Sequence, residues 1–336
     1  MAATLHVGAL HGGGLVLGYR CPSRCQHCLY GCGPHRRDGE PAGEDGLERV
    51  LDLLAERAPG ARLHIGGGEP FLDTDRLERA VVGLLQRGLA LDYVETNAMW
   101  ARSADQTERI LRRLADRGLP CVLVSLSPFH AEHVPLARTL RLIEIAERVL
   151  SQGAFVWIPE LLRDLADVDR EQRLDLDAWL AERGSRYARE LATRYGLVTA
   201  GRAGRFVHRY GARSPWRELL GRAPCRARLA DTSHFHVDGE GAYVPGLCAG
   251  LQLPLGRLPG PVDLSGYPLL GALVEGGLVS LISLAQSHGF EPAETYASGC
   301  DLCTHARLFL YPHRFAELGP EGFYDERSVP GFHRAE

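Results

Sequence analysis

The chain has 336 residues, of which 45% are hydrophobic and 24% charged, and its formal net charge is −4. This length accommodates one large domain with a smaller appendage, and the composition is that of a globular protein with no nucleic-acid partner. All 38 basic residues are arginine, which excludes mechanisms that need a lysine Schiff base or a phosphate-loop lysine.

The first residues, MAATLHVGALHGGG, lack the charged and apolar segments of a secretory signal. We therefore expect a cytoplasmic protein, whose cysteines are thiols, metal ligands or catalytic groups. No apolar run reaches the length of about 20 residues that crosses a bilayer, so no membrane partner is expected. Only about a dozen residues precede the first predicted strand, so we expect no fused cobalamin-binding or peptide-recognition domain there.

Short β-like runs alternate with amphipathic helix-like stretches from about residue 14 to 210. The predicted strands begin at Gly14, Arg62, Leu91, Cys121 and Ala154, with a weaker one at Arg205. The predicted helices span 47–57, 75–88, 140–150 and 174–195. Repeated βα units with apolar strands predict an α/β fold with a parallel sheet, either a partial (β/α)6 TIM-like barrel or an open curved sheet. Its active site is expected at the carboxyl ends of the strands.

The alternation ends at about residue 212, which predicts two units, 1–212 and 213–336. In the second unit, HFHVDGEGAYVPG predicts a hairpin with its turn near Asp238–Gly241. A Pro- and Gly-rich connection then leads to a predicted helix at about Leu269–His288 and to the motif GCDLCTHARLFL.

Four of the nine cysteines lie in GYRCPSRCQHCLYGCG, directly after the first predicted strand. Cys21, Cys25 and Cys28 form C-x3-C-x2-C, and extended spacers of this length span only about 10 to 14 Å, so the thiols can reach one ion or cluster. A structural site takes four protein ligands, whereas three leave a position for a substrate or cofactor. The alternative is a structural zinc site completed by His27, Cys32 or a distant residue.

The loop after the second predicted strand reads HIGGGEPFL. C-x3-C-x2-C followed by GGEP on consecutive βα units resembles the radical S-adenosylmethionine (SAM) superfamily, over roughly residues 14–210. The resemblance implies that Cys21, Cys25 and Cys28 hold a [4Fe-4S] cluster with one iron open to the amino and carboxylate groups of SAM. Further SAM contacts that it implies are Gly67, Gly68, Glu69 and Pro70 at the methionyl ammonium, His27 beside the adenine, and Thr96, Asn97, Ser125 and Ser127 at the carboxylate and ribose.

The same resemblance implies the reaction. A one-electron donor such as flavodoxin or ferredoxin would reduce the cluster, and SAM would be cleaved to methionine and a 5′-deoxyadenosyl radical that abstracts a hydrogen atom from the substrate. The protein would position the substrate C–H bond and exclude water.

A second cysteine set, Cys225, Cys248, Cys300 and Cys303, lies in the C-terminal unit. Four thiolates indicate a closed site, either zinc or an iron-sulfur cluster. The layout resembles the Twitch module, a truncated relative of SPASM, which implies a second, auxiliary [4Fe-4S] cluster acting in electron transfer. The hairpin departs from that pattern, because eight residues separate Gly239 from Cys248 where four are usual.

Several other residues are candidates with two interpretations each. Cys121 is expected in the core, and Cys32 is either a solvent-facing thiol or a hydrogen-atom donor near SAM. His130 and His133 follow the fourth predicted strand and are either solvated or able to deprotonate or bind the substrate. Further residues predicted to face the pocket are Glu160, Arg209 and Tyr210.

The leading hypothesis is a radical SAM enzyme that acts on a small sugar, cyclitol or amino-acid type substrate in specialised metabolism. The second is a maturase that modifies a ribosomal peptide by a crosslink, thioether or epimerisation. A non-enzymatic metal scaffold is disfavoured, since it has no use for the GGEP motif.

Overall fold

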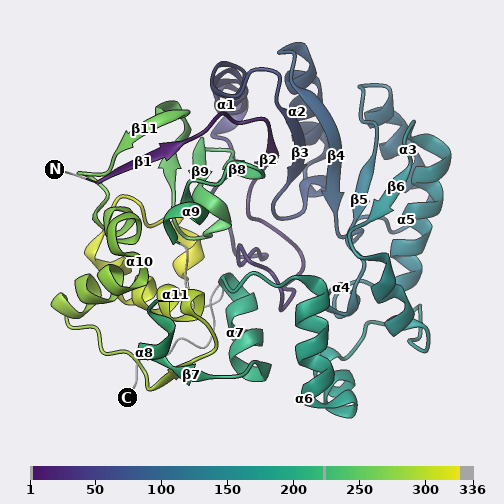
Figure 1. Cartoon of the computed structure of the whole chain (residues 1–336). Helices are drawn as coiled ribbons and strands as arrows, with labels where there is room; N and C mark the ends of the chain where they lie inside the picture. Colours follow the sequence, from purple (N-terminus) through teal and green to yellow (C-terminus); the bar gives the residue numbers. More distant parts are fainter. Residues whose placement is uncertain (1–2, 222–224, 326–336) are drawn as a thin grey trace.

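Six parallel strands form the centre of the fold. Within residues 3–221 and 225–325, which this computed structural model describes, an eight-stranded sheet runs in the order β10-β9-β8-β2-β3-β4-β5-β6 (Figure 1). All neighbours from β8 to β6 pair in parallel. The strands are β2 (Gly12–Val16), β3 (Arg62–Gly66), β4 (Ala90–Thr96), β5 (Val122–Val124), β6 (Ala154–Val156) and β8 (Phe235–Asp238). The predicted α/β fold with a parallel, TIM-like sheet is confirmed.

Amphipathic helices connect these strands and cover the sheet on its outer side (Figure 1). Two of them begin where a side chain accepts a hydrogen bond from the first turn: Asp73 from the Arg76 amide and Ser103 from the Gln106 amide. Their apolar faces are buried, as Leu77 shows with no exposed surface. The helices are α1 (Gly43–Arg57), α2 (Thr74–Gln86), α3 (Ala104–Ala115), α4 (Pro128–Ala131) and α5 (Leu136–Val149).

The segment at Arg205, predicted as a weak sixth strand, is helical. It belongs to α7 (Gly201–Tyr210), which follows α6 (Leu176–Tyr195). Ala203 and Phe206 are buried three residues apart, and Phe206 stacks near Tyr210 one turn later, so the segment buries a helical stripe. The sixth parallel strand is instead β8, which pairs with β2 from the C-terminal part of the chain.

The predicted hairpin is present. β8 pairs antiparallel with β9 (Ala242–Val244), and β9 with β10 (Leu253–Pro254). The remaining strands pair at the edge of the fold: β1 (Thr4–Val7) with β11 (Gly260–Asp263), and β7 (Ser214–Pro215) with β12 (Thr295–Tyr296). The other α-helices are α8 (Trp216–Leu219), α9 (Cys225–Leu229), α10 (Pro268–Ser287) and α11 (Gly299–Leu310).

Short 3-10 helices complete the described chain: η1 (Pro70–Leu72), η2 (Pro159–Leu165), η3 (Pro245–Leu247), η4 (Leu255–Arg257), η5 (Tyr311–His313) and η6 (Glu321–Tyr324). The main sheet crosses residue 212, because β8 and β9 continue it beyond β2. A division into units 1–212 and 213–336 stays a prediction, and residues 326–336 of the second unit lie outside the described residues.

Helix α10 corrects the expectation that no segment is apolar enough to cross a bilayer. By length and composition it could span a membrane. Half of its most apolar window is buried inside the protein, where Leu278 and Leu281 are at most 1% exposed. It packs against α9 and α11, so this fold uses α10 as a core helix.

The carboxylate of Asp238 fixes the turn of the β8–β9 hairpin. Oδ1 accepts hydrogen bonds of 3.0 Å from the Glu240 and Ala242 amides, and Oδ2 accepts one of 3.3 Å from the Tyr19 hydroxyl. Burial raises the pKa of Asp238 to about 6. Because the folded state holds this proton more tightly than the unfolded state, the contribution of Asp238 to the free energy of unfolding falls as the pH rises toward 6.

We predict that Asp238→Ala lowers the free energy of unfolding by about 1 kcal/mol, since the Glu240 and Ala242 amides lose their acceptor. Asp238→Asn keeps the acceptor for both amides and stays neutral, so it gains stability relative to the native chain between pH 5 and pH 7. Urea unfolding at pH 5 and pH 7 measures the difference in the free energy of unfolding between the native chain and Asp238→Asn. An identical pH dependence for the native chain and Asp238→Asn would contradict the assignment.

Candidate functional site

The main cavity, of about 570 Å³, is lined by the carboxyl ends of the parallel strands and the loops that follow them. Residues 195–198, which follow α6, and Arg202 of α7 close it on another side. The sequence-predicted site residues that line it are Cys21, Cys25, His27, Cys28, Gly67, Gly68, Thr96, Asn97 and Ser125. The fold therefore brings the cysteine loop, the GGEP loop and the polar strand ends to one hollow, as expected for the carboxyl edge of a parallel sheet.

The cysteine loop folds back on itself. The Cys21 amide donates to the Gly33 carbonyl at 3.2 Å, and the Cys28 amide donates to the Cys25 carbonyl at 3.1 Å. Cys32 is only 2% exposed, so it is not a solvent-facing thiol. Its backbone amide donates to Cys28 Sγ at 3.3 Å. Four thiols are thus held on one short loop at the cavity.

The pKa values of these thiols differ because their surroundings differ. Burial raises the pKa of Cys21 to about 12 and also raises that of Cys25. The hydrogen bond from Cys32 lowers the pKa of Cys28 to about 5. A metal or cluster needs thiolates, so a bound group would replace the protons of the two high-pKa thiols.

Arg202 is a site residue that the sequence analysis missed. Its side chain is 6% exposed, and its guanidinium donates to the carbonyls of Cys25 (3.1 Å) and Cys32. The Arg202 amide donates to the Cys28 carbonyl, and Nη1 has no partner among the described residues. Arg202 lowers the pKa of Cys21, Cys25 and Cys28, so it supplies buried positive charge to the thiols.

The GGEP loop is joined to the cysteine loop by backbone hydrogen bonds. The Gly68 amide donates to the Gly18 carbonyl at 2.8 Å, and the Glu69 amide donates to the Arg20 carbonyl at 2.9 Å. A Cβ atom at position 68 would lie 1.9 Å from the Arg20 carbonyl oxygen. Gly67, at φ 113°, has a conformation that side chains rarely allow. Both glycines are therefore needed for the close approach of the two loops.

The Glu69 carboxylate points into the protein and is fully occupied there. Oε1 accepts from Thr96 Oγ1 at 2.9 Å and from the Phe71 amide at 3.2 Å, and Oε2 accepts from the Asn97 amide at 2.8 Å. Burial raises the pKa of Glu69 to about 7. Glu69 thus ties the GGEP loop to the end of β4.

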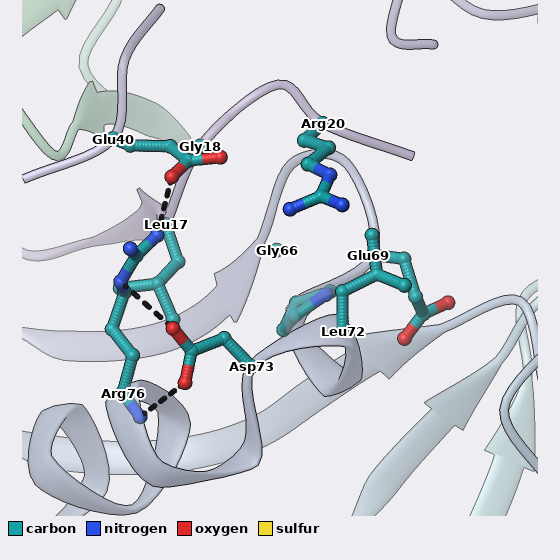
Figure 2. Close-up of a pocket in the computed structure, with 10 residues that line it drawn as sticks. Leu17, Gly18, Arg20, Glu40, Gly66, Glu69, Leu72, Asp73 and Arg76 are labelled. Atoms are coloured by element: carbon teal, nitrogen blue, oxygen red, sulfur yellow. Dashed lines mark hydrogen bonds and ion pairs between the residues drawn. The ribbon is translucent and has the colours of Figure 1, made fainter. Parts of the chain in front are cut away.

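Glu69 and Pro70 line a separate pocket of about 60 Å³, room for about two water molecules. Figure 2 shows Arg76 in that pocket, paired with Glu40 and Asp73, while the Glu69 side chain extends away from them. The pocket is too small for a cofactor.

The polar strand ends differ in how they face the cavity. The Asn97 Nδ2 group lies 3.3 Å from Cys21 Sγ, to which it donates. Thr96 Oγ1 is already used by Glu69 and by Trp100 Nε1. Ser125 lines the cavity, whereas Ser127 is 1% exposed and bonds to His130 Nδ1 at 2.8 Å.

His27 lies in an aromatic group with Phe129, His130 and Tyr195, with ring centroids 4.4 to 5.1 Å from its own. Cys25, His27 and His130 have donor atoms within 4.8 Å of one another, so this group could also hold a single metal ion. His130 is 8% exposed, which excludes the solvated interpretation for that residue, and burial lowers its pKa to about 3. His133 is 21% exposed at its side chain.

The four C-terminal cysteines come from α9 (Cys225), the end of η3 (Cys248) and α11 (Cys300 and Cys303). The negative charges of Cys303 and Cys300 add to burial in raising the pKa of Cys225 to about 11, which indicates that the thiols are neighbours. Two arginines lie beside them, Arg228 with Nη1 at 3.9 Å from Cys300 Sγ and the buried Arg307.

Three other predicted residues do not line the cavity. Glu160 is exposed on η2, Arg209 pairs with Asp177 at 2.9 Å on the surface, and the Tyr210 ring packs on Phe206. Cys121, directly before β5, is 6% exposed, as expected for a core residue.

No protein-family model and no curated protein matches the chain. Among solved structures, it is similar to SuiB of Streptococcus suis bound to S-adenosylmethionine, at 13% identity and a TM-score of 0.40 over 74% of this chain and 64% of SuiB. It is also similar to BtrN in complex with AdoMet and 2-DOIA, at 13% identity and a TM-score of 0.36 over 75% of this chain and 81% of BtrN.

A third similar structure is coproporphyrinogen III oxidase (HemN) from Escherichia coli, a radical SAM enzyme, at 11% identity and a TM-score of 0.39 over 88% of this chain and 89% of HemN. The aligned part is less than two thirds of the length of SuiB. At these identities and TM-scores, the similarities assign neither a reaction nor a substrate to this chain.

We predict that Arg202→Leu loosens the cysteine loop, because the Cys25 and Cys32 carbonyls lose a charged donor. The expected loss is about 2 to 4 kcal/mol in the free energy of unfolding, with less iron retained after gel filtration. Arg205→Leu, on the same helix but exposed, is the matched control. Equal unfolding midpoints and equal iron contents for the two variants would refute this role.

Proposed function

We propose that this chain is a radical SAM enzyme whose site is the cavity at the carboxyl ends of β2 to β6. The observation that carries the proposal is the joining of two loops from consecutive βα units. Backbone hydrogen bonds hold the C-x3-C-x2-C loop against the GGEP loop, and both line one cavity. A closed structural metal site needs neither the glycine backbone nor the cavity beside its ligands.

The surroundings of the three thiols fit an iron-sulfur cluster. Cys21, Cys25 and Cys28 face the same hollow, and Arg202 offers a buried positive charge to the anionic group that they would hold. The Asn97 amide donates to Cys21 Sγ, and such hydrogen bonds to ligand sulfurs tune reduction potentials. When bound, the cluster and SAM supply a 5′-deoxyadenosyl radical for hydrogen-atom abstraction.

The SAM contacts are assigned to residues that line the cavity. The backbone of Gly67 and Gly68 lines the cavity, so its carbonyls can accept from the methionyl ammonium. Asn97 and Ser125 present polar groups to the carboxylate and ribose, and His27 an aromatic ring to the adenine. Glu69 and Thr96 act indirectly, because their side chains fix the GGEP loop against β4.

The favoured substrate is a small molecule of sugar, cyclitol or amino-acid type. A cavity of about 570 Å³ must hold SAM as well, and it falls within the range of about 300 to 1,000 Å³ typical of single small-ligand sites. The competing candidate is a peptide substrate. Trp157, 64% exposed at the cavity, favours it by offering an apolar face to a substrate that extends outside.

We further propose that the C-terminal cysteines hold an auxiliary [4Fe-4S] cluster that exchanges electrons with the substrate or with a flavodoxin- or ferredoxin-type donor. Zinc held by four thiolates at about 2.3 Å brings the sulfurs to about 3.8 Å from one another. Among the described residues, the donor groups within 4.8 Å of one another involve His64, His234 and His236 or Cys25, His27 and His130, and no C-terminal cysteine. By this measure, no three of the four C-terminal sulfurs lie as close together as a zinc site requires.

Iron counting after anaerobic reconstitution tests both sites. We predict about eight irons per chain, falling to about four in Cys21→Ala and in Cys300→Ala. Reductive formation of 5′-deoxyadenosine and methionine is lost only in Cys21→Ala, because its site would bind SAM. Cys121→Ala, a buried cysteine outside both sets, is the control and retains the full iron content.

Zinc instead of iron at the N-terminal loop, or no methionine from the reduced native chain, would exclude the proposed function. An iron content of about four in the native chain, unchanged by Cys300→Ala, would exclude the auxiliary cluster alone.

A further inference from the structure

Three histidines meet in the wall of the main cavity, away from the cysteine loop in sequence. His64 lies on β3, His236 on β8, and His234 just before β8. β3 and β8 flank β2, so they are neighbours of the same strand (Figure 1). The register sets Gly14 of β2 opposite His64 on one side and opposite His236 on the other.

Gly14 is the reason that the two imidazoles can meet. A Cβ atom at position 14 would lie 2.3 Å from His64 Nε2 and 2.7 Å from His236 Cδ2. Without a side chain between them, His64 Nε2 and His236 Nε2 approach to 3.3 Å across the strand. The rings of His64 and His236 therefore occupy the space that a side chain at position 14 would fill.

The spacing of the nitrogen atoms fits a shared metal ion. Two imidazole nitrogens bound tetrahedrally at about 2.0 to 2.1 Å lie about 3.3 to 3.4 Å apart. One donor atom each of His64, His234 and His236 lies within 4.8 Å of the others. Glu95, which also lines the cavity, has Oε1 3.6 Å from His64 Nε2.

The outer contacts of the rings match those of metal-binding histidines. His236 Nδ1 bonds to the Tyr30 hydroxyl at 2.7 Å, which leaves Nε2 toward His64. The His64 ring bonds to the backbone of Gly13. Such contacts orient ligand histidines and fix which ring nitrogen carries the proton.

We propose that His64, His234 and His236 bind one divalent first-row metal ion of the zinc type, with an open coordination position facing the cavity beside Glu95. Three histidines with one open position are a ligand set of catalytic zinc sites. In the enzyme, that position takes an oxygen donor of the substrate and orients it in the cavity that the cysteine loop shares. This substrate role rests on the proposed function, whereas the metal site does not.

The test uses the reconstituted holoenzyme, in which iron occupies the cysteines, titrated with zinc chloride and then freed of loosely bound metal. We expect about one zinc per chain, and X-ray absorption at the zinc edge should show only nitrogen and oxygen neighbours at about 2.0 Å. His64→Gln and His236→Gln should weaken zinc binding at least about tenfold. His6→Gln, exposed on β1, is the control.

If the two buried variants do not fold, His234→Gln still tests the proposal. Because His234 is exposed, this variant should retain the native melting temperature while losing zinc. A stoichiometry that none of the three variants changes would overturn the proposal. So would sulfur neighbours at about 2.3 Å or no retained zinc, the latter meaning that the histidines only hydrogen-bond to each other. Iron content and 5′-deoxyadenosine are measured on the same sample, so a failure of the proposed function is recognised separately.

Discussion

The site depends on one backbone contact, the pairing of the loop after β2 with the loop after β3. Two amide-to-carbonyl hydrogen bonds join them, from Gly68 to Gly18 and from Glu69 to Arg20. The contact is so close that position 68 has no room for a Cβ atom. It sets the position of the thiols relative to the glycine backbone, and Glu69 extends the connection to the end of β4.

Buried charge around the thiols forms the second constraint. Arg202 donates from inside the protein to carbonyls of the cysteine loop and has one nitrogen without a partner among the described residues. Burial raises the pKa of Cys21 and Cys25, and the positive charge of Arg202 opposes that shift. The pair of Arg228 and Arg307 repeats this arrangement beside the C-terminal cysteines. In both sets, the arginine charge would offset the negative charge of thiolates.

Local patterns were sufficient to predict the five parallel strands β2 to β6, most connecting helices, the hairpin and the meeting of the cysteine and GGEP loops at one edge of the sheet. They failed where distant residues decide the outcome. The apolar residues of the segment at Arg205 fit the spacing of a strand as well as that of a helix, and the packing of Phe206 favours the helix. Nothing local indicates that β8 pairs with β2, so the histidines of HFH could not be placed opposite His64. Arg202 is one of many arginines, and only the fold shows that it is buried.

The central claim is that the N-terminal thiols hold a cluster to which SAM binds directly. Electron paramagnetic resonance of reduced Cys300→Ala, in which only that cluster would remain, tests it without the second site. The account predicts a reduced iron-sulfur signal whose g values change when SAM is added. A signal that SAM leaves unchanged, or a reduced protein with no iron-sulfur signal, would contradict it.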